Sequence, residues 1–125
     1  MVVAEDDAAV REALTELVEM HPRLRLVAAV VDAWAAVDAA ARESPDVAIV
    51  DVRMPGGGGP WATREIRRLS PGTQVIAFSG SSDPTTVDAM REAGASGYLV
   101  KGSSLTTILQ AIDEAAARCS HLGAP

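Results

Sequence analysis

The sequence predicts one α/β domain, in which a parallel sheet carries helices on both faces, and three observations support this fold class. Five short apolar runs alternate with five stretches of helical periodicity along the chain. Such strict alternation is typical of parallel sheets with right-handed crossovers. The chain of 125 residues with 48% hydrophobic residues can also bury the core of one ordinary domain.

The strands are expected at the apolar runs, which are rich in valine, alanine, isoleucine and leucine. In chain order these runs are residues 2–4, 24–31, 47–50, 74–78 and 98–100. Aromatic residues make up only 3% of the chain, so aliphatic side chains must fill the core. Runs of this length, separated by helical patterns, are expected to be strands buried on both faces.

Helices are expected between these runs, and their ends carry capping signals. The candidate N-caps are Asp6 or Asp7, then Asp32, Asp83 followed by Pro84, and Ser103 or Ser104. Pro60 opens the third helix and Gly94 closes the fourth. The inward-facing positions are predicted to include Trp34, Trp61, Ile66, Leu69, Leu105 and Ile108. The last apolar stripe fades near Arg118, so residues 1–118 are predicted to form the domain and 119–125 a frayed tail.

Composition excludes several classes of function. The formal charge of −6 argues against direct nucleic-acid binding by this domain, because phosphate contacts need a basic surface. The single cysteine, Cys119, excludes an internal disulfide and a cysteine-rich zinc site, and indicates a reduced, cytoplasmic protein. The central apolar run from Leu26 to Val31 is far shorter than the roughly 20 residues of a membrane span.

Functional groups follow four of the five predicted strands. Glu5-Asp6-Asp7 follows the first strand, Asp51 the third, Ser79 the fourth and Lys101 the fifth. Parallel strands bring their carboxyl ends to one edge of the sheet, where open α/β sheets bind their ligands. Acids, a hydroxyl and an ammonium at this edge predict a site for a divalent cation and a phosphoryl group.

Alternation alone leaves the strand order open. The doubly wound, flavodoxin-like order 2-1-3-4-5 would make the first and third strands neighbours and place Glu5, Asp6 and Asp51 side by side. Three adjacent carboxylates repel one another unless a cation intervenes, and Mg²⁺ suits such oxygen ligands. The histidines, His21 and His121, lie near predicted helix ends away from the acids, which argues against zinc.

Each side chain has a candidate role at such a site. Asp51 is the best nucleophile, since it ends the middle strand and could form an acyl phosphate. Asp6 is the better metal ligand, and Glu5 acts on the metal directly or through water. Lys101 could pair with one phosphoryl oxygen and Ser79 could donate a hydrogen bond to another.

Structural explanations for single residues remain open. Glu5, Asp6 and Asp7 could merely favour the positive end of the first helix, and Tyr98 could merely pack against its neighbours. A dinucleotide-binding protein would need a glycine-rich or hydroxyl-rich loop after the first strand, where this chain has acids. The agreement of four strand ends favours the phosphoryl site.

Four segments resemble response-regulator receiver domains, which have the CheY-like fold, and the resemblance therefore implies a five-stranded parallel sheet in the order 2-1-3-4-5. They are VVAEDD, VAIVDVRMP with Gly59 four residues beyond the proline, VIAFSG, and AGASGYLVK, in the order and spacing of that family. Many receivers have a proline after the lysine, but here Gly102 follows Lys101. This variant resembles receivers of LuxR-type (NarL/FixJ) regulators. The run from Gly56 to Gly59 is richer in glycine than is usual there.

The resemblance implies a role for each matching residue. Asp51 would be the phosphoacceptor, Glu5 and Asp6 the acidic pair, and Asp6 a direct Mg²⁺ ligand. The backbone carbonyl of Arg53 would be a further ligand, and Lys101 would match the family's lysine. The resemblance also makes Ser79 the switch hydroxyl and Tyr98 the switch aromatic. Arg53 and Gly80 would tune the lifetime of the acyl phosphate.

The function implied is that of a two-component signalling switch. A sensor histidine kinase would phosphorylate Asp51, and the domain would catalyse only its own phosphorylation and dephosphorylation. Output would come from homodimerisation, or from a helix-turn-helix DNA-binding domain beyond Pro125. The alternative is a phosphorylation-independent interaction module on the same fold, which usually lacks the acceptor or the lysine.

Overall fold

Five parallel strands form one sheet in the order β2-β1-β3-β4-β5 in a computed structural model, which describes residues 1–123 and their side chains as far as residue 118. The strands are β1 (Val2–Ala4), β2 (Ala28–Val30), β3 (Val47–Asp51), β4 (Gln74–Ser79) and β5 (Gly97–Val100). The helices are α1 (Ala8–Met20), α2 (Ala33–Glu43), α3 (Gly58–Leu69), α4 (Pro84–Ala93) and α5 (Leu105–Gly123). The predicted fold class and strand order are confirmed.

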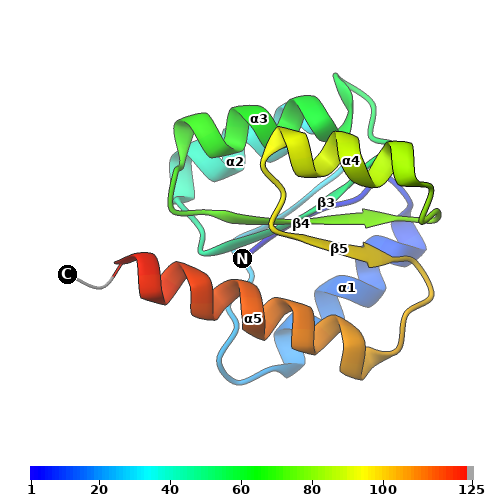
Figure 1. The fold of residues 1–125 in the computed structure, drawn as a ribbon. Coiled ribbons are helices and arrows are strands. Elements are labelled where there is room, and N and C mark those ends of the chain that lie inside the picture. The colour runs from blue at the N-terminus through cyan, green and yellow to red at the C-terminus, as the bar shows by residue number, and fades with distance from the viewer. Residues whose placement is uncertain (124–125) are drawn as a thin grey trace.

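Helices cover both faces of the sheet. Figure 1 shows α2, α3 and α4 on one face and α1 and α5 on the other. The buried apolar side chains form two clusters, one beneath α1 and α5 and one beneath α2 and α3. Val3 and Ile49 belong to the first cluster and Val2 and Val50 to the second, because successive strand residues point to opposite faces. No helix within residues 1–123 is long and apolar enough to cross a membrane.

Strand register sets the position of the functional groups. Ala4 of β1 pairs with Val50 of β3, so the residues that follow both strands emerge together. Asp51 pairs with Phe78 of β4, and Ser79 pairs with Val100 of β5. The ends of these four strands therefore lie at one edge of the sheet.

Capping decides which acids remain available to that edge. Asp7, rather than Asp6, caps α1, with its Oδ1 accepting the Val10 N–H at 3.1 Å. Asp32 caps α2 by accepting the Ala35 N–H at 2.7 Å. At α5 it is Ser104 that accepts the Thr107 N–H, at 3.2 Å. Because Asp7 satisfies the helix end, Asp6 is left for another role.

Three predicted core positions are wrong. The exposed fractions of Trp34 and Leu105 are both 67%, and that of Leu69 is 44%. Trp34 and Leu105 lie in the first turns of α2 and α5, on the side of each helix that faces solvent. The inward positions there are occupied by Ala33 and Ile108 instead.

Two element boundaries also differ from prediction. The second strand is only Ala28–Val30 rather than 24–31, because β2 is an edge strand and its one partner, β1, offers three residues for pairing. Helix α5 continues to Gly123 rather than ending near Arg118, because helix propagation needs a backbone hydrogen bond and not an apolar stripe. The last two residues of the expected tail, 124–125, lie outside the described residues.

Candidate functional site

The acids predicted to meet at the sheet edge do meet there. Carboxylate oxygens of Glu5, Asp6 and Asp51 lie within 4.8 Å of one another. Glu5 is fully buried and Asp51 is 3% exposed, whereas Asp6 is exposed. Asp51 occupies its position because β3 lies between β1 and β4, with backbone pairing on both sides.

Backbone amides orient the two buried carboxylates. The Asp7 N–H donates to Oε2 of Glu5 at 3.0 Å, and the Arg53 N–H donates to Oδ1 of Asp51 at 3.2 Å. Both donors lie two residues beyond the acid that they contact, as in an Asx-type turn. The turns that follow β1 and β3 therefore fix the direction of both side chains.

Lys101 connects the two buried acids. Its Nζ lies 2.8 Å from Oε1 of Glu5 and 3.4 Å from Oδ2 of Asp51. The backbone holds the lysine in place, because the Lys101 N–H donates to the carbonyl of Ser79 at 2.7 Å. One ammonium thus faces a cluster of three carboxyl groups, which leaves an excess of negative charge.

The pKa shifts follow from burial and from this crowding. Burial raises the pKa of Glu5, against the opposing effects of Lys101 and the Asp7 amide. Hydrogen bonding with Asp51 and then Glu5 lowers the pKa of Asp6. Burial by itself lowers the pKa of Lys101, but the hydrogen bond to Glu5 and the charges of both acids outweigh it, so that the pKa is raised. Burial of Glu5 thus acts in the direction that favours its protonated form.

The donor set fits a magnesium ion. All the side-chain groups offered are carboxylate oxygens, which Mg²⁺ prefers, and the exposure of Asp6 leaves room for water ligands. Among the described residues, the ammonium of Lys101, at 2.8 Å, is the partner of the buried Oε1 of Glu5. A divalent cation would relieve the repulsion that remains.

A cavity of about 310 Å³ opens beside Asp51. The cavity is lined by Asp51, Arg53, Ser79, Gly80, Ser81 and Lys101. All of these except Ser81 are predicted site residues. The other predicted site residues, Glu5, Asp6 and Tyr98, are not part of the lining. The cavity volume is ample for a phosphoryl group, and its walls carry a carboxylate, hydroxyl groups and an ammonium. Arg53 and Gly80 are exposed at this cavity, between Asp51 and solvent.

Tyr98 lies outside this cavity but is tied to its wall. The Tyr98 hydroxyl donates to the carbonyl of Ser81 at 2.7 Å. The N–H of Ser81 in turn donates to Oγ of Ser79 at 3.2 Å. Ser81 therefore contacts both predicted switch residues.

Sequence reasoning missed two residues that support the site. Ser81 was missed because its role depends on two backbone groups, which no side-chain motif reveals. Arg11 of α1 was missed as well: its Nη1 donates to the carbonyls of Glu5 at 3.0 Å and Asp6 at 3.4 Å. A basic residue one helical turn beyond the cap Asp7 is the signal that could have found it.

Comparisons with known proteins agree with the fold and the site. Residues 1–113 match the family model of the response regulator receiver domain. The transcriptional regulatory protein LnrK of Bacillus subtilis is 30% identical over 90% of this chain and 51% of its own length. The chain spans about half the length of the first curated relatives that it matches.

Solved structures give the same result. The receiver domain of the putative response regulator NarL from Mycobacterium tuberculosis has a TM-score of 0.87 and 30% identity, over 93% of this chain and 94% of that one. A LuxR-family two-component response regulator from Aurantimonas sp. SI85-9A1 has a TM-score of 0.86 and 33% identity, over 93% of this chain and 83% of that one. The similarity to LuxR-type receivers is thereby confirmed, and the chain belongs to the response regulator receiver domain family.

Proposed function

We propose that this domain is phosphorylated on Asp51 by a sensor histidine kinase and changes its output surface in response. The observation that carries the proposal is the meeting of a buried acceptor carboxylate, two neighbouring acids and one lysine beside a single cavity. Its family is the receiver domain of two-component response regulators, which act in signalling rather than as ordinary enzymes.

Glu5, Asp6 and Asp51 are the residues proposed to hold Mg²⁺, together with the backbone carbonyl of Arg53. Glu5 serves directly or through water, since its Oε1 already faces Lys101. When bound, the ion would neutralise negative charge on the acids and on the incoming phosphoryl group.

In the proposed transfer, an oxygen of Asp51 attacks the phosphorus of a phosphohistidine. The new P–O bond forms as the P–N bond breaks, and the imidazole nitrogen keeps the electron pair and takes a proton from solvent. Lys101 pairs with one phosphoryl oxygen, where it can exchange its contact with Asp51 for one with the product. Ser79 donates to a second oxygen, since its Oγ accepts from Ser81 and its own proton remains free to donate. Water attack on phosphorus later restores the carboxylate.

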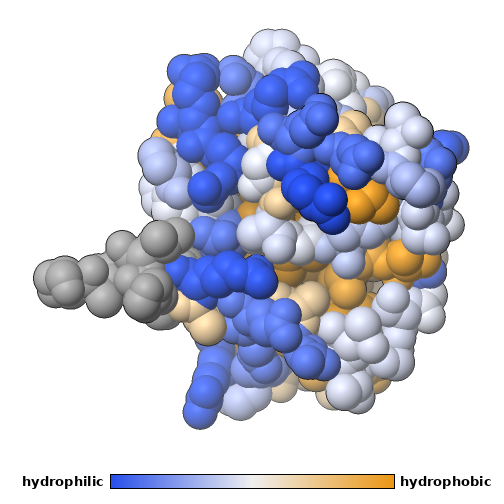
Figure 2. Space-filling view, viewed as in Figure 1, coloured by the Kyte–Doolittle hydropathy of each residue, from blue (hydrophilic) through white to orange (hydrophobic). Residues whose placement is uncertain are grey.

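Movement of Ser79 toward the phosphoryl group would also displace the loop that carries Ser81, because the Ser81 N–H donates to Oγ of Ser79. Ser81 contacts both Ser79 and the Tyr98 hydroxyl, so displacement of this loop changes the hydrogen bond that holds Tyr98. Tyr98 belongs to β5, the edge strand between α4 and α5. Figure 2 shows a band of hydrophobic surface at this edge, flanked by the polar surfaces of the helices. Phosphorylation would bias this face toward one of two conformations.

The proposed partners follow from the relatives. LnrK is a transcriptional regulator of about twice this length, which supports a DNA-binding helix-turn-helix output domain beyond Pro125 and a cytoplasmic location. The face formed by α4, β5 and α5 is a candidate homodimer surface. The charge of −6 favours a role for this domain in control of the output domain rather than in DNA contact.

Intact-mass spectrometry after incubation with acetyl phosphate and Mg²⁺ tests the proposal. Wild type should gain one phosphoryl group, Asp51→Asn should gain none, and chelation before the reaction should prevent the adduct. An adduct on Asp51→Asn would overturn the assignment of the acceptor, and none on either protein would favour the phosphorylation-independent interaction module. The same assay follows decay of the adduct: an unchanged decay rate in Arg53→Ala and Gly80→Ala would contradict their modulating role.

A further inference from the structure

The loop that leaves Asp51 has one buried side chain, Met54, and then continues into a run of glycines. Gly56, Gly57 and Gly58 all have positive φ angles, of 83°, 122° and 82°. Glycine loses more conformational freedom on folding than any other residue, so such a run has little intrinsic order. This loop also carries Arg53, whose N–H orients Asp51.

Two tryptophans occupy the space beside these glycines. A Cβ placed on Gly56 would lie 3.0 Å from Cδ1 of Trp34, and one on Gly57 would lie 2.8 Å from Cε3 of Trp61. The rings themselves are in contact, with centroids 5.3 Å apart and an interplanar angle of 47°. Trp34 comes from α2 and Trp61 from α3, so two helices enclose the loop.

Backbone contacts complete this enclosure. The Ala33 N–H, next to Trp34, donates to the carbonyl of Pro55 at 2.9 Å. The Gly59 N–H, in the first turn of α3, donates to the carbonyl of Val52, the first residue of the loop, at 2.9 Å. The path from Asp51 to α3 is thus held by one backbone bond at its middle and one across its ends, beside the two rings.

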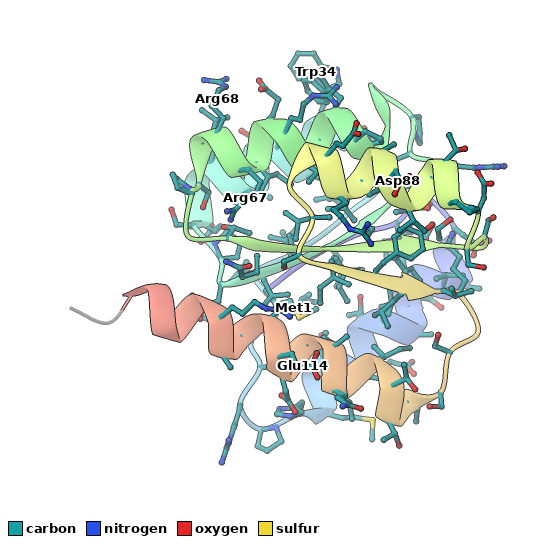
Figure 3. The ribbon with its side chains drawn as sticks, viewed as in Figure 1. Met1, Trp34, Arg67, Arg68, Asp88 and Glu114 are labelled. Carbon is teal, nitrogen blue, oxygen red and sulfur yellow. The ribbon has the colours of Figure 1, made fainter. Side chains whose placement is uncertain are left out.

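The exposure of Trp34 shows that this side chain is not part of the buried core. It is 67% exposed, and Figure 3 shows it standing out from the surface on the side formed by α2 and α3. Burial of apolar area therefore explains little of its position. Its contacts with Gly56 and Trp61 explain that position better.

We infer that Trp34 and Trp61 form a tryptophan pair that positions the loop after Asp51, and so holds the Arg53 backbone in the geometry that the metal and phosphoryl site needs. The inference rests on the proposed function. The pair acts through the loop and touches neither reactant, so both residues are positioning residues. Gly56 and Gly57 give the loop its conformational freedom, and contact with the tryptophan pair restricts that freedom.

The test compares Trp34→Ala and Trp61→Ala with Trp34→Phe and Trp61→Phe. Calorimetric titration gives the Mg²⁺ dissociation constant, well below the melting temperature of each variant, and intact mass gives the rate of modification by acetyl phosphate. We expect each alanine variant to bind Mg²⁺ roughly threefold to tenfold more weakly, the factor that corresponds to loss of one aromatic pair. Phosphorylation should slow in parallel. The phenylalanine variants, which keep an aromatic pair, should stay close to wild type.

Met20→Ala is the matched control, since Met20 is 83% exposed and lies at the far end of α1. Folded alanine variants with the wild-type Mg²⁺ dissociation constant would overturn the inference, even if their melting temperatures fell, as would an equal loss of affinity in Met20→Ala. Should Trp61→Ala fail to fold, the exposed Trp34 carries the test. A wild type that binds Mg²⁺ but forms no adduct would refute the proposed function and leave the pair to be judged on Mg²⁺ affinity. A wild type that binds no Mg²⁺ would refute both.

Discussion

Asp51 is held between one cation and two further acids, which makes its charge costly to the metal-free protein. Lys101 lies nearer to Glu5 than to Asp51, at 2.8 Å against 3.4 Å. The lysine therefore neutralises Glu5 first, and repulsion between Asp51 and its acidic neighbours is only partly offset. The residue best placed for chemistry is thus also a source of instability, as is common at functional sites.

Asp51→Asn should therefore stabilise the metal-free protein, by about 1 kcal/mol in the free energy of unfolding. Like-charge repulsion at this separation is worth a few kcal/mol at an effective dielectric constant of about 20, and the lost attraction to Lys101 cancels part of the gain. Urea denaturation without Mg²⁺ measures the difference. Asp38→Asn, on the exposed side of α2, is the control and should change stability by less than about 0.5 kcal/mol. A less stable Asp51→Asn would contradict this view of the cluster.

Several site residues could be predicted because their side chains themselves carry the charged or hydroxyl groups that act at the site. Asp51, Ser79 and Lys101 each follow an apolar run, and parallel strands must bring such ends together. Arg11 and Ser81 could not be predicted in this way, because they act on backbone carbonyls whose positions depend on the finished fold. Backbone acceptors are present at every residue, so the sequence carries no mark of the ones that are used.

Helix and strand periodicity predicted the elements well and their exposed first turns poorly. The caps at Asp32 and Asp83 were predictable, since an acid before a helical pattern satisfies free N–H groups. Trp34 and Leu105 were not, because periodicity cannot tell which apolar residue of a first turn packs inward, and Ala33 and Ile108 do so here. The length of β2 depended on its partner rather than on its own residues.

Gly59, where the turn after β3 enters α3, packs closely against the backbone, and a substitution tests this packing. A Cβ there would lie 2.7 Å from Cα of Val52 and 2.8 Å from the carbonyl oxygen of Asp51, which are backbone atoms and cannot move freely. Gly59→Ala should lower the free energy of unfolding by roughly 1–3 kcal/mol. Gly72→Ala is the matched control, since no atom lies within 4 Å of its added Cβ. Equal stability of the two variants, measured by urea denaturation, would show that this contact is loose.

The molecule as a whole should respond to Mg²⁺ as a ligand that binds only the folded state. At about ten times the dissociation constant, the free energy of unfolding should rise by roughly 1.4 kcal/mol. For a domain of this size, that corresponds to an increase of about 5 °C in the melting temperature. Asp6→Asn keeps the buried acids and removes an exposed ligand, so it should lose most of this increase. The same increase in both proteins would place the ion elsewhere.

The interior position of β1, the shortest fully buried strand, also bears on how the chain folds. Val3 pairs with Ala29 on one side and with Ile49 on the other, so β1 depends on segments synthesised well after it. During synthesis, β1 cannot pair along both of its edges until β3 has emerged from the ribosome. Pairing over such sequence distances slows folding and prolongs exposure of apolar surface. The strand order that brings the acids together thus leaves the first-made strand unpaired along one edge until the third strand has emerged.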